Sequence, residues 1–277
     1  RFMTINTLLR KVNQNKRFNI NTYDFFKPTF NVKLAESRGE IKLAQKLRYK
    51  VFFSERIKNP ILNIGNFRRD SDKFDNYADH IIVTHRKSKF SKTKVIGTYR
   101  LLKQSVAEKK SGFYSCDEFN LENLLNSRIY NNMLELSRSC ISQKFRNKNV
   151  LQLMWKEIHH YINKNNIDAL FGTASFLSTN VSKIEDQLIY LNHHHKMPDN
   201  ITVSALPKYR VNIDYQKKIN LNIRLFAKLP TLIKAYLKFN ASIGIGAVID
   251  NKFKTTDVFI FLPIEKINKE YVNKILD

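Results

Sequence analysis

The stretch MLELSRSCI, residues Met133–Ile141, decides the fold because apolar and polar side chains alternate along it. Successive side chains of a strand point to opposite faces, so this period of two predicts a β-strand with one apolar and one polar face. Glu135, Ser137 and Ser139 share the polar face. Arg138 points away from them unless a β-bulge changes its direction.

The segments on either side of this strand continue an alternation of helices and strands. Apolar residues that recur every three or four positions predict helices, and short apolar runs beside polar turns predict strands. The order α, β, β, β, α, β indicates an α/β or α+β protein with a mixed, mostly antiparallel sheet flanked by helices. The expected elements are a helix from Ile41 to near Ser54, a hairpin of Ala78–Thr84 and Lys94–Leu102, the strand above, a helix Val150–Asn163 and a strand Ala169–Phe176.

The composition indicates a globular protein with anionic partners. Of the 277 residues, 48 are Lys or Arg and 24 are Asp or Glu, so the net charge is +24. With 43% hydrophobic residues the chain can bury a core. The positive field would attract nucleic acid, an anionic membrane or an acidic carrier protein. The lysines are scattered and no nucleic-acid-binding motif is visible, so we do not expect nucleic acid, and a basic nucleic-acid-binding module is the non-enzyme alternative.

Sequence signals favour a cytoplasmic location. The charge-free stretch Ala169–Ser182 has fourteen residues, whereas a transmembrane helix needs about 20. The N-terminus has no apolar segment of signal-peptide length. Two cysteines, Cys116 and Cys140, allow one disulfide at most and fit a reducing compartment. We expect a cytoplasmic protein that is peripheral on the inner membrane.

The chain divides into three predicted parts. Residues 1–34 form a basic arm, which lies on an anionic surface or on the domain itself, or else supplies an N-terminal strand and linker. Residues 35–200 form the core, and residues 201–277 form a C-terminal extension packed on the same domain. Within the extension, Leu221–Asn240 mixes basic and apolar residues. It is either an interfacial helix on anionic lipid or a helix packed on the domain with solvated lysines.

Three groups of polar residues are candidates for chemistry. The segment RRDSDKFDNYADH, residues 68–80, is either a solvated acidic loop or a site for a cationic substrate. Glu135 on a mid-sheet strand needs an ion pair, a hydrogen-bond network or a functional role, because burial of an unpaired carboxylate is unfavourable in free energy. The run of three histidines at residues 193–195 lacks flanking ligands at metal-binding spacing, and we expect no metal site.

Eleven motifs resemble the bacterial ornithine lipid N-acyltransferases, in consistent order from about residue 34 to 270. The resemblance implies a Gcn5-related N-acyltransferase fold. It also implies transfer of a 3-hydroxyacyl chain from acyl carrier protein to the α-amino group of ornithine, which yields lyso-ornithine lipid. The motifs are LRYKVF (47–52), DKFDNYADH (72–80), VIGTYRLL (95–102), GFYSCDEFNL (112–121), LELSRSCI (134–141), VLQLMWKEI (150–158), LFGTASF (170–176), YLNHHHKMP (190–198), ALPKY (205–209), LPTLIKAYLKFNASIGIGAVID (229–250) and TTDVFIFLP (255–263).

A shorter subset, LRYKVF, DKFD, GTYR and ELSR, is similar to the acyl-homoserine lactone synthases. They share the fold and the carrier-protein donor but lack the long C-terminal block, so its presence favours the lipid enzyme. A lactone-synthase-like enzyme, or an acyltransferase for another amino acid, stays an alternative. The similarity implies a polar cluster of Arg48, Phe52, Asp72, Asp75, Arg100, Glu135 and Arg138.

Direct attack of an amine on a thioester assigns roles within this cluster. Glu135 would accept the amine proton, directly or through water, and backbone N–H groups near Ser137 and Arg138 would hold the oxyanion. One of the three arginines, Arg48, Arg100 or Arg138, would bind the α-carboxylate. Asp72 or Asp75 would pair with the side-chain ammonium of ornithine. No metal or diffusible cofactor is expected, and Cys116 and Cys140 are interpreted as packing residues.

The loop SQKFRNKNVL, residues 142–151, lacks the glycine that family members often have at this position. A carrier-bound phosphopantetheine has a single phosphodiester, whereas coenzyme A has in its place a pyrophosphate, which such glycine loops hold. Lys144, Arg146 and Lys148 would suffice for a single phosphodiester. The loop therefore favours acyl carrier protein as the donor.

Overall fold

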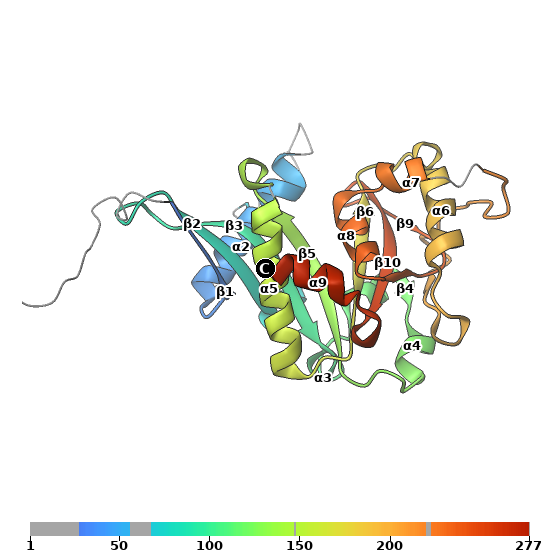
Figure 1. The fold of residues 1–277 in the computed structure, drawn as a ribbon, viewed down its shortest axis with the longest axis horizontal. Helices are drawn as coiled ribbons and strands as arrows, with labels where there is room; N and C mark the ends of the chain where they lie inside the picture. The colour runs from blue at the N-terminus through green and yellow to red at the C-terminus, as the bar shows by residue number, and fades with distance from the viewer. Residues whose placement is uncertain (1–27, 56–67, 147, 220–222, 277) are drawn as a thin grey trace, which may run out of the picture.

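The computed structural model describes residues 28–55, 68–146, 148–219 and 223–276, and one mixed sheet forms its centre (Figure 1). The strands are β1 (Thr29–Leu34), β2 (Asp79–Arg86), β3 (Lys94–Lys103), β4 (Phe119–Asn120), β5 (Met133–Ile141), β6 (Ala169–Phe176), β7 (Ser204–Ala205), β8 (Ser242–Ile243), β9 (Val248–Asp250) and β10 (Thr255–Pro263). The sheet has the order β1-β2-β3-β5-β6-β10-β8, with β9 on β10, and β4 pairs separately with β7. Of the paired strands, β5 and β6 are parallel and the other pairs are antiparallel. The predicted class is confirmed.

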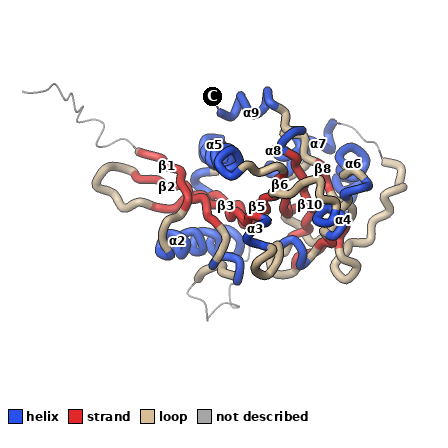
Figure 2. The backbone as a smooth tube through the Cα atoms, turned by 90° about the horizontal axis from the view of Figure 1, so that it is seen from below, coloured by secondary structure: helices blue, strands red, loops and turns tan. Residues whose placement is uncertain are grey.

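Helices cover both faces of the sheet. In Figure 2, α5 lies on one side of strands β1 to β3 and α2 lies on the other. The apolar side of α5, with Met154, Trp155 and Ile158, is buried against the sheet strands. The α-helices are α2 (Arg38–Tyr49), α3 (Gln104–Ala107), α4 (Glu122–Asn126), α5 (Lys148–Asn165), α6 (Glu185–His195), α7 (Ile223–Lys228), α8 (Thr231–Lys238) and α9 (Lys269–Leu276).

The first predicted helix is confirmed, and its end has an unusual geometry. Ser37 caps α2 by accepting a hydrogen bond from the backbone N–H of Glu40 at 3.2 Å. The helix then continues as a π-helical turn, Lys50–Ser54, which ends where the apolar pattern ends. Such turns are rare and are frequent at functional sites. This turn places Phe52 in the molecular interior.

Strands β5 and β6 run together for only a few residues and then separate. Their register pairs Met133 to Glu135 with Ala169 to Phe171 and goes no further. At Gly172 the strands are still so close that an added Cβ would lie 2.1 Å from the carbonyl oxygen of Leu136. Only glycine permits this approach. Beyond it, the two strands form the sides of an opening in the sheet.

A β-bulge interrupts β5 at the same level. Thr98 pairs with Cys140 and Arg100 pairs with Ser137, so two residues of β5, Arg138 and Ser139, lie opposite one residue of β3. Arg138 has φ +54°, in the left-handed region. The bulge turns the Arg138 side chain, which simple alternation directs to the other face, toward the side of Ser137.

The two ends of the predicted core differ in detail from the three-part division. The last residues of the predicted arm form β1, which pairs with β2, and residues 1–27 lie outside the described part of the chain. In the region 201–277, residues Thr256 to Pro263 of β10 pair with all eight residues of β6. The C-terminal region therefore completes the main sheet.

The segment Leu221–Asn240, of which 223–240 is described, forms α7 and α8, with Pro230 between them. Its apolar residues Leu225, Leu229, Ile233 and Tyr236 are buried in the core. The packed-helix interpretation is therefore the one that the structure supports. Among the described helices, none is long and apolar enough to cross a membrane.

Candidate active site

A cleft of about 1000 Å³ opens where β5 and β6 separate. One side consists of residues 136–141 of β5, and the other consists of residues 173–176 of β6. Apolar side chains, among them Leu136, Leu151, Phe176 and Leu232, line part of the cleft. Arg138, Tyr114 and Asp257 make another part polar. The cleft therefore offers both an apolar surface and charged groups.

Behind one wall of the cleft, Arg48 is the centre of a buried ionic cluster. Its side chain is fully buried and donates through Nε to Asp70 at 3.0 Å and through Nη1 to Asp75 at 2.8 Å. Its Nη2 donates to Asp75 and to the carbonyl oxygen of Asp70. All three nitrogens are occupied, so Arg48 is not free to bind a substrate carboxylate.

Arg100 and Arg138 complete this cluster. Arg100 donates to Asp75 at 3.2 Å, to Asp72 and to the hydroxyl of Ser137. Arg138 pairs with Asp72 at 3.0 Å, and its guanidinium lies over the Tyr114 ring, 4.5 Å from the centroid. It also pairs with Asp70. Three guanidinium groups thus meet three carboxylates, and of the three arginines Arg138 lines the cleft.

The acidic segment is therefore not a solvated loop, because Asp70 and Asp75 are each 4% exposed. Asp72 and Asp75 already pair with arginines, and their role toward a cationic substrate stays a prediction. Burial alone would raise the pKa of Asp75, but Arg48 and Arg100 hold it well below its usual range. Asp72 also caps the turn Lys73–Asn76. Burial lowers the pKa of His80 to about 4, so this neighbouring ring is neutral at pH 7. The negative charge of the segment is already compensated by arginines.

Glu135 lies apart from these ion pairs. Its carboxylate accepts hydrogen bonds from the backbone N–H groups of Tyr114 and Ser115, at 2.9 and 2.7 Å, and from the Ser115 hydroxyl at 2.7 Å. It is 1% exposed and does not line the cleft. Burial raises its pKa, although these hydrogen bonds oppose the shift. The geometry shows that Glu135 fixes the turn Tyr114–Asp117.

The remaining predicted residues differ in their position relative to the cleft. Phe52, Ser137 and Arg146 line the cleft, and Arg146 forms an ion pair with Glu55. Lys144 is exposed in the short turn before α5, and the side chain of Lys148 lies outside the described part of the chain. Cys140 is buried, whereas Cys116 is exposed, so its interpretation as a packing residue is wrong.

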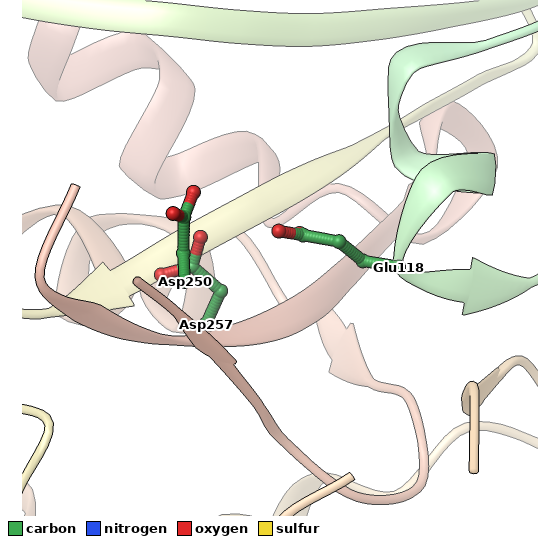
Figure 3. A group of neighbouring side chains, drawn as sticks. All are labelled: Glu118, Asp250 and Asp257. Carbon is green, nitrogen blue, oxygen red and sulfur yellow. The ribbon is translucent and has the colours of Figure 1, made fainter. Parts of the chain in front are cut away.

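A second group of carboxylates, at the polar part of the cleft, was not predicted. Glu118, Asp250 and Asp257 face one another, with ligand oxygens within 4.8 Å (Figure 3). Burial raises the pKa of Glu118 to about 8 and that of Asp257 to about 6. A sequence signal for this group exists: Asp257 is the one charged residue of the otherwise apolar strand TTDVFIFLP.

The sequence matches the acetyltransferase (GNAT) domain family over residues 47–156. This match and the mixed sheet with separating strands define the class of the protein, an N-acyltransferase of the GNAT fold. A solved CoA-dependent acyl-homoserine lactone synthase covers 89% of this chain and 88% of its own, with 11% identity and a TM-score of 0.46.

Curated relatives identify the particular family. The L-ornithine N(alpha)-acyltransferase of Brucella abortus (strain 2308) is 39% identical over 248 residues, which is 88% of each chain. The enzyme of the same name from Rhizobium meliloti (strain 1021) is 38% identical and covers 87% of this chain and 82% of its own. The chain belongs to the L-ornithine N(alpha)-acyltransferase family. The resemblance found in its motifs is thus confirmed.

Proposed function

We propose that the protein transfers a 3-hydroxyacyl chain from acyl carrier protein to the α-amino group of ornithine and releases lyso-ornithine lipid. The observation that carries the proposal is the cleft between β5 and β6, which combines an apolar surface with Arg138 and carboxylates. The apolar residues Leu151, Phe176 and Leu232 would contact a long acyl chain. The charged residues of the cleft would contact the amino-acid acceptor.

The thioester would lie beside the bulge of β5. A bulge leaves a backbone group without a ladder partner, and backbone N–H groups near Ser137 and Arg138 are therefore the proposed donors to the tetrahedral oxyanion. The amine attacks the thioester carbon, the carbon–sulfur bond breaks, and the leaving thiolate takes up the proton that the nitrogen loses, directly or through water. Only the neutral amine is a nucleophile, so the α-ammonium form of ornithine must lose a proton before the attack. The chemistry itself requires no metal or diffusible cofactor.

Arg138 is the proposed partner of the α-carboxylate. It lines the cleft, whereas all three nitrogens of Arg48 are occupied and Arg100 does not line the cleft. The Tyr114 and Phe253 rings lie 4.5 and 4.8 Å from its guanidinium carbon and fix its plane. The predicted role of Glu135 as proton acceptor stays a prediction. Its hydrogen bonds favour a positioning role, because they hold the turn that carries Tyr114.

The donor is proposed to be carrier protein, whose phosphopantetheine phosphate would meet Lys144 and Arg146 at the mouth of the cleft. Acyl carrier proteins are acidic, and the positive surface of this chain complements them. Lys144 is exposed for such a contact, and Arg146 is about half exposed. The partner would therefore approach at the turn before α5.

The test is release of free carrier thiol from 3-hydroxyacyl carrier protein, with ornithine compared with glycine, glutamine and S-adenosylmethionine. The proposal expects release with ornithine. Release with S-adenosylmethionine would favour the lactone-synthase-like alternative, and release with another amino acid would change the acceptor. No release with any of them, together with salt-sensitive binding of nucleic acid, would favour the binding-module alternative.

The product is an amphiphile, and we propose that the enzyme contacts the anionic leaflet through the β2–β3 hairpin. This hairpin projects from the left of the molecule in Figure 1. At its tip Phe90 is 78% exposed between exposed lysines. An exposed aromatic ring among lysines is typical of interfacial binding, and each lysine near anionic lipid contributes about 1 kcal/mol.

Sedimentation with vesicles tests this contact. The variant F90A/K92E/K94E should lose binding to phosphatidylcholine vesicles that contain phosphatidylserine. K109E/K110E, which changes charge equally at two exposed lysines elsewhere, should keep more of it. Equal loss in both variants would show that net charge alone determines binding.

A further inference from the structure

The carboxylates of Glu118, Asp250 and Asp257 converge from distant parts of the chain. Glu118 follows the turn Tyr114–Asp117, Asp250 ends β9 and Asp257 lies on β10. In Figure 3 the Glu118 side chain points across a gap toward the other two. Among the described residues, none of the three takes part in an ion pair closer than 4.0 Å. In a chain with net charge +24, this gathering of uncompensated carboxylates requires an explanation.

The hydrogen bonding of Asp257 is a second observation that points to a ligand at this group of carboxylates. Its side chain lines the cleft, the residue is 6% exposed, and its buried Oδ1 has no hydrogen-bond partner among the described residues. Glu118 Oε2 is buried and without such a partner as well. A buried acceptor without a donor costs about 1–3 kcal/mol, and more when it is charged. A cationic donor that enters from the cleft would satisfy both atoms.

Asp250 has a local task that the other two lack. Its Oδ1 accepts hydrogen bonds from the backbone N–H groups of Lys252 and Phe253, at 2.7 and 3.0 Å, and so closes the turn between β9 and β10. No comparable turn contact involves the carboxylates of Glu118 or Asp257 among the described residues. These two residues are therefore the ones to test.

We propose that Glu118 and Asp257, with Asp250 behind them, bind the side-chain ammonium of the amino-acid acceptor. This inference rests on the proposed function and moves the ammonium site from Asp72 and Asp75, whose charges are compensated by arginines. Arg138 lines the same cleft as Asp257, and its charge acts on both Glu118 and Asp257. One cleft thus presents a cation for the α-carboxylate and anions for the side-chain ammonium, which is the charge pattern of a basic amino acid.

The protonation of the site supports this assignment. The raised pKa values of Glu118 and Asp257 come first from burial and then from the charges around them. Glu118 faces Asp257, Asp250 and Asp117, with Arg138 acting in the opposite sense. For Asp257, the hydroxyls of Ser175 and Thr255 and the charge of Arg138 oppose the shift. An ammonium group among these carboxylates would lower both pKa values and so favour their ionised forms.

The experiment compares ornithine with norvaline, which has the same carbon chain but no δ-amino group. Titration calorimetry measures binding of each amino acid to wild type, Glu118→Gln, Asp257→Asn and the control Asp199→Asn, an exposed carboxylate that pairs with Lys196. Loss of one charged hydrogen bond corresponds to an affinity about 10- to 100-fold lower. The affinity of the two site variants for ornithine should fall by this factor, and their affinity for norvaline should not change. The control should have the affinities of wild type.

Several results would overturn the inference. Equal loss for ornithine and norvaline would assign the carboxylates to folding or proton transfer. Unchanged ornithine affinity in both site variants would exclude the contact. Ornithine binding that EDTA abolishes and Mg²⁺ or Ca²⁺ restores in wild type would make the group a metal site. Because binding needs no acyl donor, these outcomes are separate from the thiol-release assay that tests the proposed function.

Discussion

Asp75 shows how one buried carboxylate can hold several donor groups of the fold together. Its oxygens accept hydrogen bonds from Arg48, Arg100 and Gln45, and it is 4% exposed. Asp75→Asn should lower the free energy of unfolding by about 3–5 kcal/mol, because the fully buried Arg48 would lose its main partner. Because the folded-state pKa of Asp75 is depressed, its contribution is present above the unfolded value of about 3.9 and is lost as the pH falls below it.

Urea unfolding measures this change, with Asp199→Asn as the control. Asp199 pairs with Lys196 at the surface, where an ion pair contributes about 0–1 kcal/mol. A loss at Asp75 no larger than that at Asp199 would contradict the assignment of Asp75 to the structural cluster.

Glu135 distinguishes a proton acceptor from a positioning residue. As a base, Glu135→Gln would lower the rate by roughly 10²- to 10⁴-fold and would remove the acidic limb that Glu135 contributes to the pH–rate profile. As a positioning residue, it would lower the thermal midpoint and raise the ornithine KM but leave that limb in place. We expect the second result, because all three hydrogen bonds of Glu135 go to Tyr114 and Ser115. Loss of the limb at an unchanged midpoint would restore the catalytic role.

The preference for ornithine should depend on pH through Glu118 and Asp257. Carboxylates must be ionised to attract an ammonium group, and their pKa values are raised to about 8 and about 6. The ratio of kcat/KM for ornithine to that for norvaline should therefore fall as the pH decreases from about 8 to about 6. Titration of the α-amino group affects both substrates and cancels in the ratio. Competition kinetics measure it directly, and a ratio independent of pH in wild type would contradict the expectation.

At the scale of elements, the periodicity of the sequence predicted individual strands and helices. It could not predict contacts between residues that are far apart in the chain. The alternation in Met133–Ile141 gave the strand and its polar face, but the bulge at Arg138 depends on pairing with β3. The acidic segment looked solvated because Arg48, its partner, lies in a helix far back in the chain. Glu118 and Asp257 meet only because β10 enters the sheet beside β6. The chemistry of a site is therefore harder to predict than the strands that carry it.

The turn before α5 carries the prediction for the donor. Lys144→Ala with Arg146→Ala should raise the KM for acyl carrier protein several-fold and leave the ornithine KM unchanged, because Arg146 lines the cleft and Lys144 is exposed in the turn beside it. The effect should shrink as salt shortens the Debye length from about 10 Å at 0.1 M to about 3 Å at 1 M. Steady-state kinetics with K109E/K110E as the control measure it. A variant that loses vesicle binding but keeps its carrier KM would assign this surface to the membrane.

At the scale of the whole molecule, the charges divide into a positive exterior and buried compensated or acidic clusters. The net charge of +24 suits the proposed carrier-protein donor and the proposed membrane contact, since both partners would be anionic. The cleft between β5 and β6 is lined by apolar side chains and by Arg138 and Asp257. Arg138 pairs with Asp70 and Asp72 in the buried cluster and also lines the cleft. It is therefore the residue of the cluster that the proposed chemistry uses.

The most direct test of the central claim is mass spectrometry of lipids from cells that express the chain, in a host that lacks ornithine lipids. Acyl transfer to ornithine predicts a new lipid with one 3-hydroxyacyl chain in amide linkage to the α-nitrogen. Expression of Arg138→Ala should give little or none. Absence of any acylated ornithine from cells that contain folded wild-type protein, or acylation of a different amino acid in its place, would contradict the account.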